Sequence, residues 1–128
     1  WTYYLTTSGD NSNSFATRFG WGCRIPWLTR ILPGSGKGDN NWEGSFFEDW
    51  PSNILLVSAE PARDGKSCII HIRETDGKNA SLNLVNGLTG SKFIPEEVDV
   101  TGKPVSHPTI EIGPLESKFY RIPLEINQ

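Results

Sequence analysis

Methionine is absent from this chain of 128 residues, and cysteine and histidine occur only twice each. Because the first residue is Trp1, we expect a mature form, a proteolytic fragment or an excised domain. Long apolar runs are absent too. The longest, from Ile54 to Val57, has the length of a strand, whereas a membrane-spanning helix needs about 20 apolar residues. The sequence therefore predicts no membrane-spanning helix and no membrane partner.

Clustered positive charge is also lacking. The net charge is −3 at pH 7, and the 12 lysines and arginines are scattered along the chain. Contacts to the phosphates of nucleic acids need clustered cations, and so does a polybasic membrane-binding patch. The sequence therefore predicts no nucleic-acid partner.

Motifs for catalysis or metal binding are missing as well. His71 and His107 have no third ligand at zinc-site spacing, and Cys23 and Cys68 lack the CxxC spacing of redox and zinc motifs. The two cysteines form a disulfide or remain two buried thiols, and both alternatives stay open. The glycine-rich segment 34–41 lacks the hydroxyl residue that follows lysine in a phosphate-binding loop. We expect no catalytic residue, cofactor or metal ligand from these motifs.

The oxygen-rich segment 39–49 leaves one type of metal site open. Asp39, Asn41 and Glu43 resemble the first half of an EF-hand loop, but Trp50 occupies the position where a bidentate glutamate is required. An EF-hand is therefore excluded. A looser calcium site and a solvated loop remain as alternatives.

Short alternating strands separated by turns dominate the chain. The turn signals are three glycine-containing tripeptides, Asp64-Gly65-Lys66, Asp76-Gly77-Lys78 and Thr101-Gly102-Lys103. The stretch 67–74 predicts a strand with Ile70 and Ile72 toward one face and His71 and Arg73 toward the other. Further strand-like stretches cover 53–59, 80–85 and 118–122.

This pattern predicts an all-β fold, an antiparallel β-sandwich that forms a single domain over residues 1–128. No segment shows convincing 3.6-residue periodicity. The one helical alternative is a short helix or turn between Ile25 and Ile31, which Pro26 and Pro33 bracket tightly.

All five tryptophans fall within the first 50 residues. Tryptophan usually serves the core, but its ring face also stacks on the C–H surfaces of sugars. Trp42 and Trp50 lie beside polar loops and are our candidates for carbohydrate contact. Glu43, Glu48 and Asp49 lie in the same stretch, and a glycosidase needs two carboxylates facing each other across a bond. We favour a polar loop packed by aromatic residues onto the sheets.

The stretch from Pro51 to Thr75 resembles the C-terminal β-sandwich region of α-mannosidases of glycoside hydrolase family 38. The matching features there are a strand over 53–61, the turn Asp64-Gly65 and a strand over 69–75. Downstream, the turn Ile112-Gly113-Pro114-Leu115-Glu116 and the following strand Lys118–Leu124 are also similar to that region. Upstream, the similar segments are Trp1–Thr7, which looks like a strand, and Arg18–Trp27. The similarity spans nearly the whole chain.

The resemblance implies a non-catalytic role. In these enzymes the catalytic carboxylates and the zinc ligands belong to upstream domains, so no catalytic residue carries over to this chain. It implies a C-terminal fragment of a larger glycoside hydrolase that buttresses an upstream catalytic domain and borders its substrate cleft. The parent enzyme would use zinc in that catalytic domain, and this chain would hold no cofactor. Enzymes of this kind are often exported, so we expect a periplasmic, extracellular or lysosomal-type location.

Two other functions remain open. One is an independent carbohydrate-binding module that holds an oligosaccharide on exposed tryptophans, with Trp42 and Trp50 as contacts. The other is a small self-sufficient glycosidase, which would need two carboxylates about 5–9.5 Å apart in one cleft.

Overall fold

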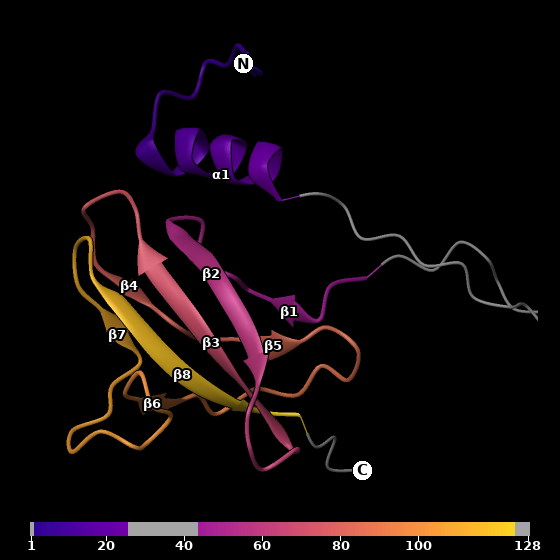
Figure 1. Ribbon diagram of the computed structural model, residues 1–128, viewed down its shortest axis with the longest axis vertical. Coiled ribbons are helices and arrows are strands. Elements are labelled where there is room, and N and C mark those ends of the chain that lie inside the picture. Colours follow the sequence, from indigo (N-terminus) through magenta and orange to yellow (C-terminus); the bar gives the residue numbers. More distant parts are fainter. Residues whose placement is uncertain (1, 26–43, 125–128) are drawn as a thin grey trace, which may run out of the picture.

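The computed structural model describes residues 2–25 and 44–124. Over these residues the fold is mostly β, with antiparallel sheets and one short helix (Figure 1). In chain order the elements are α1 (Asn13–Arg24), β1 (Phe47–Glu48), β2 (Ile54–Pro61), β3 (Ser67–Glu74), β4 (Ala80–Ser81), β5 (Val85–Asn86), β6 (Glu96–Val98), β7 (Glu111–Ile112) and β8 (Ser117–Pro123).

The main sheet has four antiparallel strands in the order β2-β3-β8-β6. Its first two strands form a hairpin whose turn contains Gly65 at φ 67°, a conformation that glycine adopts without a steric penalty. The Asp64 side chain fixes this turn, since its Oδ1 accepts hydrogen bonds from the backbone N–H groups of Lys66 and Ser67. The predicted hairpin turn is confirmed here.

Burial follows the predicted alternation along β3. Ile70 and Ile72 are both fully buried, while Arg73 is exposed and His71 half-buried on the opposite face. Residues directly across an antiparallel pair share a face. On β8 the buried partner of Ile70 is Tyr120, so the two strands share one apolar inner face.

The core lies between the inner face of the main sheet and two short ladders, β4-β7 and β1-β5. Its fully buried side chains from outside the main sheet are Leu82, Leu84 and Ile112. Each ladder has only two strands, so a second continuous sheet is not established. The prediction of an all-β fold is confirmed in part: the described residues are mostly β with antiparallel sheets, but they include one helix. The sandwich stays a prediction.

A helix at Asn13–Arg24 corrects the expectation that no segment is helical. Ser12 caps it, since its Oγ accepts a hydrogen bond from the backbone N–H of Phe15. Ile25 ends it in an extended conformation, as expected for a residue that precedes a proline. Of the short helix or turn expected between Ile25 and Ile31, only Ile25 is among the described residues, and the remainder lies outside them. Among those residues no helix has the length and apolar character to cross a membrane.

Two other local expectations need correction. Residues 2–8 form no strand, because no neighbouring strand pairs with them and their side chains point into solvent. The Asp76-Gly77 turn is not a hairpin, because it joins β3 to β4 and these strands belong to different sheets. The Asp76-Gly77 turn itself was predicted correctly, but whether two segments pair as strands depends on residues distant in the sequence.

Candidate functional site

Trp50, one of the two predicted sugar contacts, is half-buried and packs against the core. Its Nε1–H donates a hydrogen bond of 2.8 Å to the carbonyl oxygen of Ile54, and its ring lies 5.6 Å from that of Phe47. The indole therefore makes both packing and polar contacts within the fold. Sugar stacking on Trp50 stays a prediction, and Trp42 lies outside the described residues.

The aromatic residues around Trp50 form a cluster with Phe46, Phe47 and Phe93. Ring centroids in this cluster lie between 4.9 and 5.6 Å apart, with edge-on or tilted geometry. Such pairs stabilise a fold beyond the area they bury. The cluster packs β1 and its flanking loop onto the core, as expected for a polar loop held by aromatic residues.

The acidic residues of this loop lie on the surface. Glu48 and Asp49 are both exposed, and the side chain of neither has a hydrogen bond or an ion pair with another described residue. Glu43, the third carboxylate of the predicted group, lies outside the described residues. The two placed carboxylates are therefore solvated.

The two cysteines are free thiols, each half-buried. Burial raises the pKa of the Cys68 thiol, which packs against the core as a small apolar residue. The alternative of a disulfide is therefore not realised. Within the described part of the chain no three histidine, cysteine or carboxylate side chains are grouped to hold a metal ion. Most of the segment proposed for calcium, 39–49, lies outside that part.

A buried carboxylate, Glu74, organises one end of the main sheet. Its side chain is 0% exposed, and it accepts hydrogen bonds from the Asn53 amide and from the backbone N–H groups of Asp76, Gly77 and Leu115, each 2.8 Å long. Burial alone would raise its pKa, but the four donors together lower the pKa to about 2. Glu74 therefore joins β2, β3 and the turn before β8 as a permanent anion.

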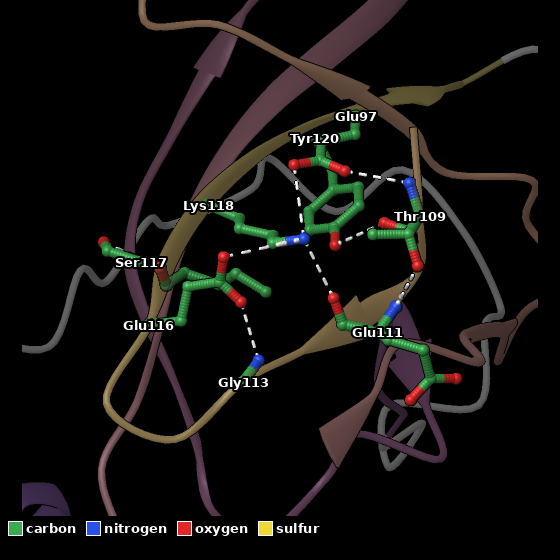
Figure 2. A network of polar contacts seen from close by, with 9 residues as sticks. Glu97, Thr109, Glu111, Gly113, Glu116, Ser117, Lys118 and Tyr120 are labelled. Atoms are coloured by element: carbon green, nitrogen blue, oxygen red, sulfur yellow. Dashed lines mark hydrogen bonds and ion pairs between the residues drawn. The ribbon is translucent and has the colours of Figure 1, made fainter. Parts of the chain in front are cut away.

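A second polar network lies on the inner side of β8 (Figure 2). The Lys118 ammonium group, 10% exposed, lies 3.3 Å from Glu97 Oε1 on β6 and 3.8 Å from Glu116 Oε1. It also donates a hydrogen bond of 2.9 Å to the carbonyl oxygen of Glu111 on β7. The phenol of Tyr120 donates a hydrogen bond to a backbone carbonyl nearby, and burial raises its pKa. These groups satisfy one another and connect β6, β7 and β8.

The N-terminal part of the chain exposes apolar side chains. In α1 only Ser14 is buried, and the aromatic residues of the helix stay half-exposed. In the segment before it Tyr3, Tyr4 and Leu5 are 81%, 59% and 95% exposed. We call residues 3–25 the N-terminal apolar surface.

The N-terminal apolar surface meets the main sheet at the end where β2 begins (Figure 1). A hollow of about 290 Å³ lies between them, lined on the helix by Thr17 and Trp21 and on the sheet by Leu55 and Arg73. The Ser14 backbone N–H donates a hydrogen bond of 2.7 Å to Asp76 and so holds the start of the helix against the β3–β4 turn. The helix is therefore fixed at its first turn and loosely packed beyond it.

Sequence reasoning missed both Glu74 and α1. For the helix a signal was present, because Phe15, Phe19 and Cys23 recur every four residues behind a serine cap. For Glu74 the only signal is an acidic residue two positions before the Asp of an Asp-Gly turn, which does not reveal burial. Comparison of the chain with known protein families, curated proteins and solved structures finds no match.

Proposed function

We propose that this chain is a non-catalytic domain of an α-mannosidase-like glycoside hydrolase, where it packs against the catalytic domain and buttresses it. The N-terminal apolar surface is the observation that carries this proposal. Monomeric proteins rarely leave neighbouring large apolar side chains in water unless another surface covers them. A permanent neighbour in the same polypeptide would supply that cover.

The sequence resemblance points to the kind of neighbour. Its motifs cover three of the four strands of the main sheet, β2, β3 and β8, and two parts of the N-terminal apolar surface, residues 3–7 and 18–25. Under this proposal the main sheet and the two short ladders are the layers of a small β-sandwich. The zinc and the catalytic carboxylates of the enzyme belong to the neighbouring domain, and the whole enzyme is exported.

The test uses the native protein. An antibody raised against residues 1–128 isolates it from its source cells, and its mass and its hydrolysis of 4-nitrophenyl α-mannoside are measured. We expect a polypeptide well above 14.2 kDa that hydrolyses this substrate, while the isolated chain does not. A native protein of the isolated chain's mass, or a larger one without α-mannosidase activity, would contradict the proposal.

A pair of matched substitutions locates the contact surface. Leu5 is 95% exposed on the N-terminal apolar surface, and Leu88 is 51% exposed in the turn after β5. In the native-length enzyme Leu5→Ser should lower the midpoint of thermal inactivation, and Leu88→Ser should not. In the isolated chain both substitutions should change the unfolding free energy by less than about 0.5 kcal/mol, because both side chains lie in solvent. Equal effects in the enzyme would show that residues 3–25 are not the contact.

A further inference from the structure

The β2–β3 turn lies at the end of the main sheet remote from α1 (Figure 1). At this end the side chains on the outer face of the sheet line a groove. The groove consists of three adjoining hollows of about 370, 310 and 250 Å³. Arg63, Ile69 and Thr101 line both the first and the second hollow, and Asp64 and Arg121 line both the second and the third. The hollows therefore form one elongated depression.

The floor and one end of this groove are apolar and fixed in position. Ile69 lies at its centre, and the rings of His71 and Phe119 stack at one end with centroids 4.3 Å apart and planes at 12°. The His71 Nε2 is hydrogen-bonded to Ser117 Oγ at 2.7 Å, which holds the imidazole ring in place. The aromatic pair is therefore a rigid wall.

The turn between β6 and Pro104 forms the opposite wall. Asp99 Oδ1 accepts hydrogen bonds from the backbone N–H groups of Thr101 and Lys103, which fixes the turn. Its Gly102 has φ +83°, and a Cβ there would lie 2.9 Å from the side chain of Ile69. Val100, 78% exposed, projects from the same turn and lines the first hollow. This close approach pre-forms the groove before any ligand arrives.

The rim offers hydrogen-bonding groups that the fold does not use. Glu60 and Arg63 are exposed beside the first hollow, and the side chain of neither has a hydrogen bond or an ion pair with another described residue. The other arginine of the groove, Arg121, is bound to Glu96 and to the carbonyl oxygen of Gly102. A carboxylate and a guanidinium together offer acceptors and donors with no net charge.

We propose that this groove binds a neutral oligosaccharide. The aromatic wall and Ile69 would contact the C–H faces of the sugar rings, and Glu60 and Arg63 would hydrogen-bond to hydroxyl groups. An elongated site with an apolar floor and a few free polar groups matches the general anatomy of ligand sites. The balanced charge of the free rim groups disfavours a polyanion. This inference goes beyond the proposed function and does not depend on it, because the groove and the N-terminal apolar surface lie at opposite ends of the sheet.

The test is a titration of the full chain, labelled with ¹⁵N, with mannotetraose and with cellotetraose, followed by NMR. We expect saturable chemical-shift changes centred on Ile69, His71 and Phe119. Changes centred on Trp50, or none at millimolar sugar in a folded sample, would overturn the proposal. So would preferential binding of inorganic phosphate or of a proline-rich peptide.

Substitutions at the rim supply the second arm. Glu60→Ala and Arg63→Ala should each weaken the affinity about tenfold, because each removes a charged hydrogen-bonding group. Both side chains are exposed and unpaired, so both variants should keep the wild-type spectrum and fold. The matched controls are Glu48→Ala and Arg73→Ala, which remove the same groups outside the groove. Equal loss of affinity in variants and controls would overturn the assignment of the rim.

Discussion

Replacing Glu74 by glutamine tests whether a buried carboxylate holds one end of the main sheet together. Four donors surround its two oxygens, namely the amide of Asn53 and three backbone N–H groups. A glutamine keeps the shape but presents an NH₂ group to two of these donors. The substitution therefore removes the charge and leaves buried N–H groups without acceptors.

The magnitude follows from the pKa of Glu74. It lies at about 2 instead of the ordinary 4.5, and at about 1.4 kcal/mol per unit this corresponds to at most about 3.5 kcal/mol of stability. Solvent at the exposed turn residue Gly77 screens the site, so we expect about 2 kcal/mol from the charge. The unpaired donors add about 1–3 kcal/mol. Glu74→Gln should therefore cost about 3–5 kcal/mol near neutral pH.

The pH dependence has a definite sign. Because the pKa of Glu74 is lowered in the folded state, its charge stabilises the fold fully above pH 4.5 and loses that effect as the pH falls through about 2. The deficit of Glu74→Gln should shrink over this window. Urea unfolding of the wild-type chain and of Glu74→Gln, at neutral pH and near pH 2, measures this deficit in unfolding free energy. Glu60→Gln is the control and should change little, because this carboxylate is exposed and has no side-chain partner in the part of the chain that the structure describes.

The result that would refute the reasoning is a deficit below about 1 kcal/mol near neutral pH, or one that does not change with pH. If Glu74→Gln fails to fold, Asn53→Ala serves as a milder variant, because it removes one of the donors and leaves the three backbone bonds intact. Its cost should be about 1–2 kcal/mol, and it should leave most of the pH dependence in place.

Three further predictions concern the core and the turns. Tyr120→Phe removes the hydrogen bond of 2.8 Å from the phenol to the Thr109 carbonyl and should cost about 1 kcal/mol in urea unfolding; no loss would show that the bond is not formed. Gly102→Ala should cost about 1–2 kcal/mol, because φ is +83° and the new methyl group would contact Ile69; a stabilised variant would contradict this. Cys68 should react with iodoacetamide much more slowly in the native protein than in urea, because burial raises the pKa of its thiol; equal rates would refute it.

Local patterns in the sequence predicted the strands well where one side faces the core. Ile70 and Ile72 are buried as expected, and the Asp64-Gly65 turn closes a hairpin. Alternation and turn chemistry act over a few residues, so one sequence is enough to read them. The antiparallel, mostly β character of the fold followed from these signals.

Pairing between strands could not be read in the same way. The 3-residue strand β6 pairs with β8, although β7 lies between them in the sequence. No local feature of Glu96–Val98 indicates that it pairs with β8. The helix was hidden because Gly20 and Gly22 have low helix propensity and favour a loop interpretation. The Ser12 cap and the hydrogen bond from the Ser14 N–H to Asp76 in the β3–β4 turn stabilise the helix nonetheless. The sequence does not reveal the contact with this turn.

The candidate sites depended still more on tertiary structure. His71 was correctly expected on a sheet face, but its stacking on Phe119 follows from the register of β3 with β8. Trp50 illustrates the opposite case, because composition marked it as a surface residue and the fold engages its N–H group. Residue type indicates what a side chain can bind, and the pairing of strands decides which side chains can bind together.

The segment before α1 and the groove at the far end of the main sheet expose different chemistry, and this difference separates the two proposals. A large apolar side chain such as that of Leu5 suits a permanent protein neighbour, because burying it gains free energy without leaving polar groups unpaired. The free charged groups of Glu60 and Arg63 suit an exchangeable, hydroxylated ligand. Substitutions at well-separated sites act independently. Leu5→Ser should therefore leave sugar binding in the isolated chain unchanged, and Arg63→Ala should leave the thermal stability of the native-length protein unchanged.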